Sequence, residues 1–135
     1  MSSPISKSAF MKAEQCLKHF YLYKNHPNLR DKISREKQFI FKRGTDVGIF
    51  AQQLFPGGID VTVGEKRNQE QFAQKTKELI EQGVSTIYEA TFIYDDLLVM
   101  VDILHKHDDK WIAYEVKSSL KITETYVKDA CFQYY

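Results

Sequence analysis

The chain has 135 residues, of which 43% are hydrophobic and 27% are charged. This composition is typical of one soluble globular domain and excludes a disordered or collagen-like chain. The two cysteines, Cys16 and Cys131, lie far apart, which excludes a disulfide-rich scaffold and favours a reducing, cytoplasmic location. The sequence has no apolar run of membrane-spanning length and no apolar segment of a secretion signal near its start, so we expect no membrane association.

Charge is distributed unevenly along the chain. Residues 1–43 hold ten Lys/Arg and three Asp/Glu, a net charge of +7, whereas residues 44–135 hold nine and fifteen, a net charge of −6. A basic half beside an acidic half is typical of a polyanion-binding surface next to a cation site. Solvated helical faces and acidic turns produce the same pattern, so charge alone leaves both explanations open.

Apolar periodicity predicts three helices in the first part of the chain, over residues 6–24, 34–54 and 66–82. Ser6 or Ser8 is the expected N-cap of the first helix, and Gly83 the C-cap of the third. A loop around Pro27 separates the first two helices, and 59–61 is a possible short strand. The expected inward-facing residues are Phe10, Ala13, Leu17, Phe20 and Tyr21 in the first helix, Phe39, Val47, Phe50, Ala51 and Leu54 in the second, and Phe72, Thr76, Leu79 and Ile80 in the third.

Three segments rich in β-branched and aromatic residues follow, at 86–94, 97–106 and 111–119. Short acidic turns separate them, which predicts a three-stranded antiparallel meander within a small mixed sheet flanked by helices. The fold class is therefore α/β, in a single domain over 1–135. The chain becomes helical again from about residue 123 and stops in mid-pattern, so we expect it to be the N-terminal part of a longer protein.

The predicted turns fix which residues of the three strands lie opposite one another. Tight turns centred at 95–96 and 108–109 pair residues whose numbers sum to 191 and to 217. Glu89 then lies opposite Asp102, and Asp102 opposite Glu115. Cross-strand neighbours have Cβ atoms about 4.5–5.5 Å apart, so the three acids form a row on one face. A single β-bulge would shift the register and place them on opposite faces.

Three carboxylates in such a row repel one another and therefore need compensation. A divalent cation such as Mg²⁺, Mn²⁺ or Ca²⁺ is the natural partner for hard oxygen ligands. Lys117, on the same face as Glu115, would add a positive charge that stabilises developing negative charge. The alternative is a solvent-facing strand with Lys117 as a simple counter-ion. Because the acids of the row repel one another, removal of one of them, as in Glu115→Gln, is expected to keep or raise stability.

Asp102, twelve intervening residues and then Glu115-Val116-Lys117 resemble the D…E-x-K core of the PD-(D/E)XK nuclease superfamily. The whole chain resembles its RecB-like exonuclease branch, and in particular the N-terminal domain of a bacterial family of unknown function. The segments that carry this resemblance are SKSAFMKAEQCLKHFYLYK, RGTDVGIFAQQLFPGG, TIYEATF, VMVDILHK, YEVKSS and DACFQYY.

The resemblance implies a restriction-endonuclease-like core with a site for Mg²⁺ or Mn²⁺. It implies that Asp102, Glu115 and the carbonyl of Val116 ligate the cation, and that Lys117 orients the hydrolytic water. Glu89 matches a family glutamate on the preceding strand. Gln133 matches a glutamine that contacts nucleic acid or positions the site.

Two positions bear on cofactors. RecB-like exonucleases often carry a metal-binding histidine four residues after a glycine, and here Gly44 is followed at that place by Gly48. Cys16 matches the first cluster cysteine of iron–sulfur members, so a cluster is possible only in a full-length protein that supplies the other ligands. The alternative for Cys16 is a small buried apolar residue.

The basic first two helices, Lys42 and Arg43 included, are expected to contact phosphates. Aromatic residues alternate with these basic residues, which suits base stacking as well as core packing. The leading hypothesis is a metal-dependent nuclease domain that hydrolyses phosphodiester bonds, with DNA expected rather than RNA. The alternatives are a catalytically impaired nucleic-acid-binding domain, and a protein-interaction module whose partner is the C-terminal region of the same protein.

Overall fold

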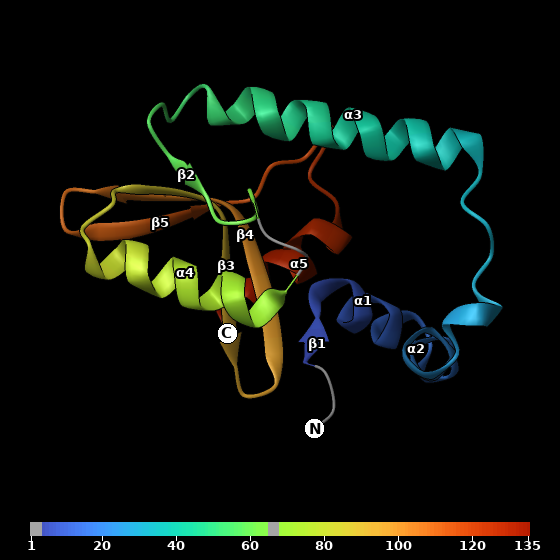
Figure 1. Cartoon of the computed structure of the whole chain (residues 1–135). Helices are drawn as coiled ribbons and strands as arrows, with labels where there is room; N and C mark the ends of the chain where they lie inside the picture. The colour runs from blue at the N-terminus through green and yellow to red at the C-terminus, as the bar shows by residue number, and fades with distance from the viewer. Residues whose placement is uncertain (1–3, 65–67) are drawn as a thin grey trace.

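The computed structural model describes residues 4–64 and 68–135, and it shows a mixed sheet surrounded by helices (Figure 1). No described helix is long and apolar enough to cross a bilayer. The elements in chain order are β1 (Ile5–Ser6), α1 (Lys7–Gln15), α2 (Leu17–Asn25), the 3₁₀ turn η1 (Pro27–Leu29), α3 (Arg35–Gln52), β2 (Ile59–Asp60), α4 (Gln69–Glu81), β3 (Thr86–Tyr94), β4 (Leu97–His107), β5 (Lys110–Tyr114) and α5 (Glu124–Tyr134).

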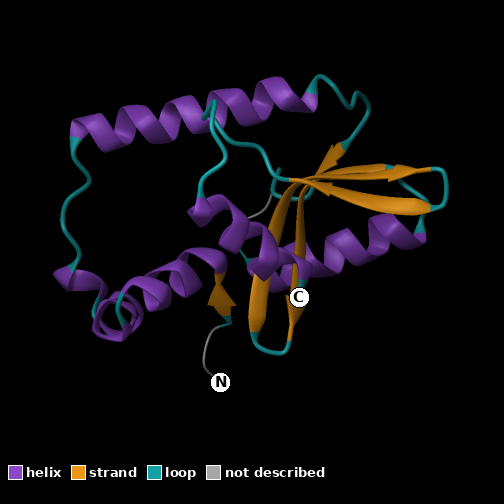
Figure 2. Cartoon of the chain, turned by 180° about the vertical axis from the view of Figure 1, so that it is seen from behind, coloured by secondary structure: helices purple, strands orange, loops and turns teal. Residues whose placement is uncertain are grey.

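The sheet has the order β1-β4-β3-β2, and β5 pairs with β4. β4 pairs antiparallel with β3 and with β5, whereas β1 runs parallel to β4 and β2 parallel to β3. The sheet curls as it crosses the molecule (Figure 2). The prediction of a mixed α/β architecture is therefore confirmed.

The strand pairs have the predicted register. In the β3–β4 ladder Tyr88 lies opposite Ile103 and Ala90 opposite Val101, so the residue numbers sum to 191. In the β4–β5 ladder Ile103 lies opposite Tyr114, which gives 217. Glu89 lies between two of these pairs but outside the ladder itself, because its φ of 54° turns the backbone out of the extended conformation.

β5 ends at Tyr114, so the prediction of a strand over 111–119 is wrong at its C-terminal half. The reason is a side chain that replaces a ladder bond. Val116 N–H donates to Asp102 Oδ2 at 2.6 Å rather than to a strand carbonyl. Glu115 and Lys117 therefore lie in irregular chain immediately after the strand.

The single helix predicted over 6–24 is two helices, which meet at Cys16. Cys16 has extended backbone, with φ −169° and ψ 123°, and it ends α1 while it begins α2. Neither glycine nor proline occurs near this break, so the sequence carries no signal for it. Ser6 caps α1 as predicted, since its hydroxyl accepts from Ala9 N–H at 3.3 Å.

The core lies between α4 and the sheet. Phe72, Thr76 and Leu79 are buried on α4, as predicted from their spacing, and Ile80 packs partly buried against the cluster. Residues 66 and 67 of the predicted third helix lie outside the described residues. The core cluster consists of Val61, Phe72, Leu79, Ile87, Ala90, Val101 and Leu104.

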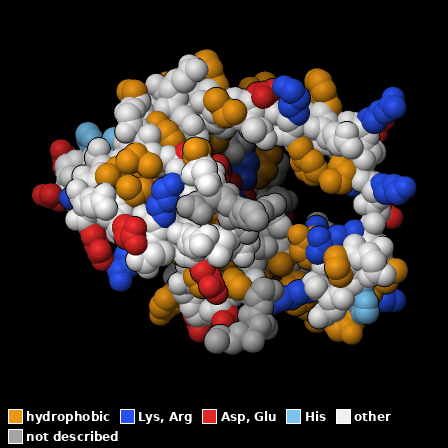
Figure 3. All heavy atoms as spheres, viewed as in Figure 1, with side chains coloured by type: hydrophobic (Ala, Val, Ile, Leu, Met, Phe, Trp, Pro, Cys, Tyr) orange, Lys and Arg blue, Asp and Glu red, His pale blue; other side chains and the backbone are white. Residues whose placement is uncertain are grey.

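α3 lies apart from this core, and the predicted burial of its apolar stripe is wrong. Phe39 and Leu54 are 69% and 74% exposed, and no residue of α3 is buried. Leu17 and Tyr21 of α2 are likewise exposed. Figure 3 shows an opening between α3 and the α1–α2 pair. The stripe has helical periodicity, but the described chain covers it only in part, at Val47 and Ala51.

The C-terminal end of α3 is held to the sheet through Tyr88 of β3. The Tyr88 hydroxyl donates to the carbonyl of Phe55 at 2.5 Å, and Gly58 N–H donates to the Tyr88 hydroxyl at 3.2 Å. A Cβ at Gly58 would collide with the Tyr88 ring, so this close approach requires glycine. The anchor places α3 over the face of the sheet that carries Glu89.

Candidate functional site

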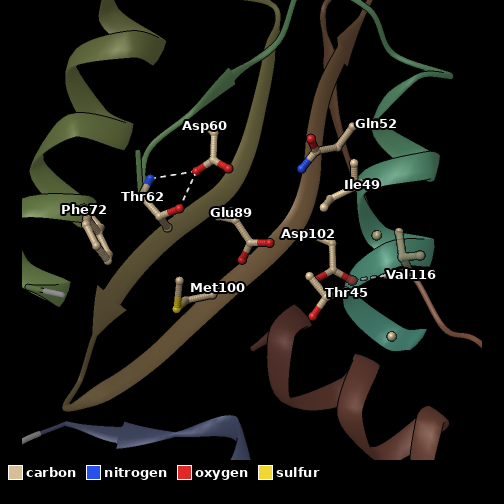
Figure 4. Close-up of a pocket in the computed structure, with 12 residues that line it drawn as sticks. Thr45, Ile49, Gln52, Asp60, Thr62, Phe72, Glu89, Met100, Asp102 and Val116 are labelled. Atoms are coloured by element: carbon tan, nitrogen blue, oxygen red, sulfur yellow. Dashed lines mark hydrogen bonds between the residues drawn. The ribbon is translucent and has the colours of Figure 1, made fainter. Parts of the chain in front are cut away.

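A cavity of about 630 Å³ lies between α3 and the sheet. Figure 4 shows Glu89 and Asp102 extending into it from the strands, with Thr45, Ile49 and Gln52 on the α3 side. Its lining residues are Gly44, Thr45, Gly48, Ile49, Gln52, Asp60, Thr62, Phe72, Glu89, Met100, Asp102 and Val116. The cavity therefore contains two of the three acids of the predicted row.

Asp102 is held by the chain segment that follows β5. One carboxylate oxygen accepts the Val116 N–H bond, which leaves the second oxygen without a hydrogen bond to the described protein. Burial raises the pKa of Asp102 above its usual range, and the Glu115 charge adds to the rise, while the Val116 hydrogen bond lowers it. A cation in the cavity would favour the ionised form of this carboxyl.

Glu89 enters the cavity from the irregular point of β3. Burial raises the pKa of its carboxyl from 4.5 to about 7, and the negative charges of Asp102 and Asp60 add to this rise. Its backbone conformation is supported by Thr91, whose hydroxyl donates to the Glu89 carbonyl at 2.9 Å. A carboxyl with a raised pKa in a cavity is a common mark of a functional site.

Asp60 is a third acid in this cavity, and the sequence analysis did not identify it. Its Oδ1 accepts from the Thr62 N–H at 2.7 Å and from the Thr62 hydroxyl at 2.6 Å. The parallel pairing of β2 with β3 brings Asp60 opposite Tyr88, next to Glu89. An acid at the end of a short strand was the available signal, but nothing in the sequence indicates which strand β2 joins.

Glu115 is engaged by donors of the protein rather than facing the cavity. Its Oε1 accepts from Lys7 at 2.7 Å and from Lys117, and its Oε2 accepts from Gln133 Nε2 at 2.8 Å. Burial alone would raise the pKa of Glu115, but these hydrogen bonds outweigh burial and lower it. Glu115 and Lys117 line a second cavity, beside α5.

Lys117 lies between two carboxylates. It contacts Glu115 and lies 2.7 Å from Asp129 Oδ2. Burial would lower the pKa of Lys117, but the hydrogen bonds to Asp129 and Glu115 raise it above its usual range, so the amine is held in its charged form. Asp129 and Lys7 were missed by the sequence analysis. The spacing of Asp129 and Gln133, four residues apart on one helix face, was the signal for the former.

The carboxylates of the predicted row fit a divalent cation only in part. Among the described residues no group of three or more His, Cys, Asp or Glu is arranged to hold a metal ion. Glu89 and Asp102 nevertheless face one cavity, and Mg²⁺ is commonly held by one or two carboxylates with water and phosphate oxygens. These two acids are the residues that would hold the cation, with Val116 at the cavity wall, while the oxygens of Glu115 accept from Lys7, Lys117 and Gln133.

Gly48 faces the same cavity from α3. A Cβ built at Gly48 would have no atom within 4 Å, so the position has room for a side chain. The place that the resemblance assigns to a histidine is therefore open toward Glu89 and Asp102, although this chain puts no ligand there.

The remaining predicted residues lie outside the cavity. Lys42 forms an exposed ion pair with Asp46 at 2.8 Å, and Arg43 is also exposed on α3. Gln133 joins the site through Glu115. Cys16 and Cys131 are both exposed free thiols, so the expectation of a buried Cys16 is wrong.

The chain was compared with protein-family models, curated proteins and solved structures, and none of them matches it.

Proposed function

We propose that this chain is a metal-dependent nuclease domain that hydrolyses phosphodiester bonds of nucleic acid, with DNA as the expected substrate. The observation that carries the proposal is the pair of acids in one cavity. Glu89 and Asp102 extend into it from neighbouring strands, and Glu115 lies in the segment directly after β5. Two partly buried carboxylates this close together repel each other, and a divalent cation between them would offset that repulsion.

We further propose that the fold is a restriction-endonuclease-like core and that the chain belongs to the RecB-like branch of the PD-(D/E)XK nucleases. The order of Glu89 on β3, Asp102 on β4, and Glu115 and Lys117 directly after β5 supports this. Gln133 on the following helix supports it too, since its amide reaches Glu115.

The described residues would divide the chemical work. A bound divalent cation supplies the Lewis acidity that stabilises negative charge on the phosphate. Asp102 and Glu89 would bind this cation and orient it from the strands. Lys117 keeps its charge because two acids flank it, and this ammonium orients the attacking water and offsets negative charge in the transition state. Gln133 fixes the rotamer of Glu115.

The test is cleavage of labelled single- and double-stranded DNA and RNA in Mn²⁺, by wild type and by Lys117→Ala. We expect the variant to cleave at least about a hundredfold more slowly, the scale lost with one transition-state donor. Its affinity should change only a few-fold, since other basic side chains supply most phosphate contacts. Lys77→Ala, which removes an exposed lysine of α4, is the matched control. Absence of cleavage by wild type on every substrate would refute the nuclease proposal.

The second candidate is a nucleic-acid-binding domain without catalysis. Two observations favour it: Gly48 supplies no ligand, and both oxygens of Glu115 are already occupied by protein donors. Calorimetry with Mn²⁺ and a gel shift at low salt separate the candidates. Nucleic-acid binding without Mn²⁺ binding below millimolar concentrations would favour the binding domain.

A further inference from the structure

The counter-ions of the carboxylate row come from the chain itself. Lys7 Nζ lies 2.7 Å from Glu115 Oε1 and 3.3 Å from Asp129 Oδ1. Lys117 contacts the same two carboxylates. Two ammonium groups and two carboxylates therefore alternate in a closed ring that joins α1, α5 and the segment after β5. The compensation that the sequence assigned to a divalent cation is provided here by lysines.

The backbone fixes Lys7 at this place. β1 pairs with the start of β4, and Ile5 N–H donates to the Asp96 carbonyl at 2.7 Å. Ser6 then caps α1, of which Lys7 is the first residue. The Lys7 side chain is only 24% exposed, because it extends into the molecule toward Glu115 rather than into solvent. Because the backbone of Lys7 is fixed by the β1 pairing and by helix α1, the ion pair with Glu115 costs little further conformational entropy.

The charge of Lys7 acts on the whole row. It favours the ionised forms of the three acids: it partly offsets the burial that raises the pKa of Glu89 and Asp102, and it contributes to the lowered pKa of Glu115. The Asp129 side chain is 8% exposed. Its Oδ1 accepts no hydrogen bond from the described residues, and the Lys7 ammonium lies 3.3 Å from it. A divalent cation that approached these acids would meet a positive charge already in place.

We propose that Lys7 is a tethered cation that competes with the divalent cation for Glu115. This inference rests on the proposed metal-dependent function. Since Lys7 and the cation share Glu115 as a ligand, each must weaken the binding of the other. The site binds its cation with full affinity only when the Lys7 ammonium turns away from Glu115.

The test is calorimetric titration of the folded protein with Mn²⁺. Lys7→Met removes the charge and keeps the length of the side chain, and we expect the Mn²⁺ affinity to rise tenfold or more. Lys7→Arg keeps the charge and should bind Mn²⁺ as wild type does. Lys18→Met makes the same change of net charge at an exposed position of α2 and is the matched control. If Lys7→Met does not fold, Lys7→Gln removes the charge but still donates a hydrogen bond to Glu115.

The outcomes separate this inference from the proposed function. Equal or weaker Mn²⁺ binding by the uncharged Lys7 variants would show that Lys7 does not compete, and the metal centre would stand. Absence of Mn²⁺ binding in all variants, wild type included, would overturn the metal-dependent function and the competition with it. Tighter binding by Lys7→Met without cleavage of any nucleic acid would keep the competition and refute the nuclease.

Discussion

Glu89 is the residue whose protonation depends most clearly on the fold. Its pKa is raised from 4.5 to about 7, so the native state keeps a proton that the unfolded chain loses. The stabilisation from this proton is complete below pH 4.5 and is lost as the pH rises to about 7. Glu89→Gln has no carboxyl to titrate at this position, so only wild type loses this stabilisation. The free energy of unfolding of the variant relative to that of wild type should therefore increase between pH 4.5 and about pH 7.

The measurement is urea unfolding of wild type and Glu89→Gln between pH 4 and pH 8, in buffer without divalent cations. The difference between the two free energies of unfolding isolates Glu89 from other titrating groups. Gln82→Ala, which replaces an exposed side chain that does not titrate, is the control and should give a difference that does not change with pH. A constant difference for Glu89→Gln would mean that its carboxyl has an ordinary pKa.

Gly48 offers a gain-of-function test at the scale of one residue. Gly48 lines the cavity of Glu89 and Asp102, and a Cβ there would meet no neighbour within 4 Å, so Gly48→His would bring an imidazole ligand to this cavity. We expect its affinity for Mn²⁺ to rise by about tenfold, measured by calorimetry. Gly48→Ala controls for the gain in helix propensity, and Asp46→His for a histidine elsewhere on α3. Unchanged affinity in Gly48→His would place the cation away from α3.

At the scale of elements, α4 supports the irregular point of β3. The Thr91 N–H, two residues after Glu89, donates to the Thr76 hydroxyl of α4 at 2.9 Å. Both threonines are buried. Thr76→Val removes the acceptor and leaves this N–H unsatisfied, so we expect a loss of about 1–3 kcal/mol. Denaturant unfolding measures this loss of free energy, and Thr125→Val, at an exposed threonine, is the control. Equal losses in the two variants would contradict the role of Thr76.

α3 presents aromatic side chains that the sequence left open between base stacking and core packing. Phe39 and Phe41 are 69% and 59% exposed, so core packing within the described residues does not explain them. We expect the double variant Phe39→Ala/Phe41→Ala to bind single-stranded oligonucleotides at least about tenfold more weakly, at about 1–3 kcal/mol per stacked base. Fluorescence anisotropy measures this. Tyr94→Ala, at an exposed tyrosine before the β3–β4 turn, should bind as wild type does; equal losses would exclude stacking on α3.

At the scale of the whole molecule, the basic charge is concentrated on α2, α3 and the segment between them. Residues 17–43 hold eight Lys/Arg and two Asp/Glu. Nucleic acid bound through this surface releases the counterions of its phosphates. The logarithm of the affinity for nucleic acid should therefore fall linearly with the logarithm of salt concentration. Arg43→Ala should reduce the slope by roughly one phosphate contact, and Lys110→Ala, in the acidic C-terminal part, should not. An affinity independent of salt would exclude a phosphate-binding surface.

The sequence determined the local features of this protein. Alternation and acidic turns gave the strands and their register, because side-chain period and turn length are properties of neighbouring residues. The register in turn brought Glu89 and Asp102 to one cavity, whereas Glu115, predicted to complete the row, lies after the end of β5. The buried face of α4 followed from 3–4 spacing in the same way.

Only the tertiary structure decided which partners these residues have. Lys7, Asp60 and Asp129 join the site through the parallel pairing of two-residue strands and the packing of α5, and contacts between residues so far apart leave no pattern in sequence. The same holds for α3, whose apolar periodicity predicts a buried face although the described chain buries none of its residues fully. Glu115 shows the consequence: the sequence predicts repulsion that Glu115→Gln would relieve, whereas the structure pairs Glu115 with two lysines, so the substitution should lower stability.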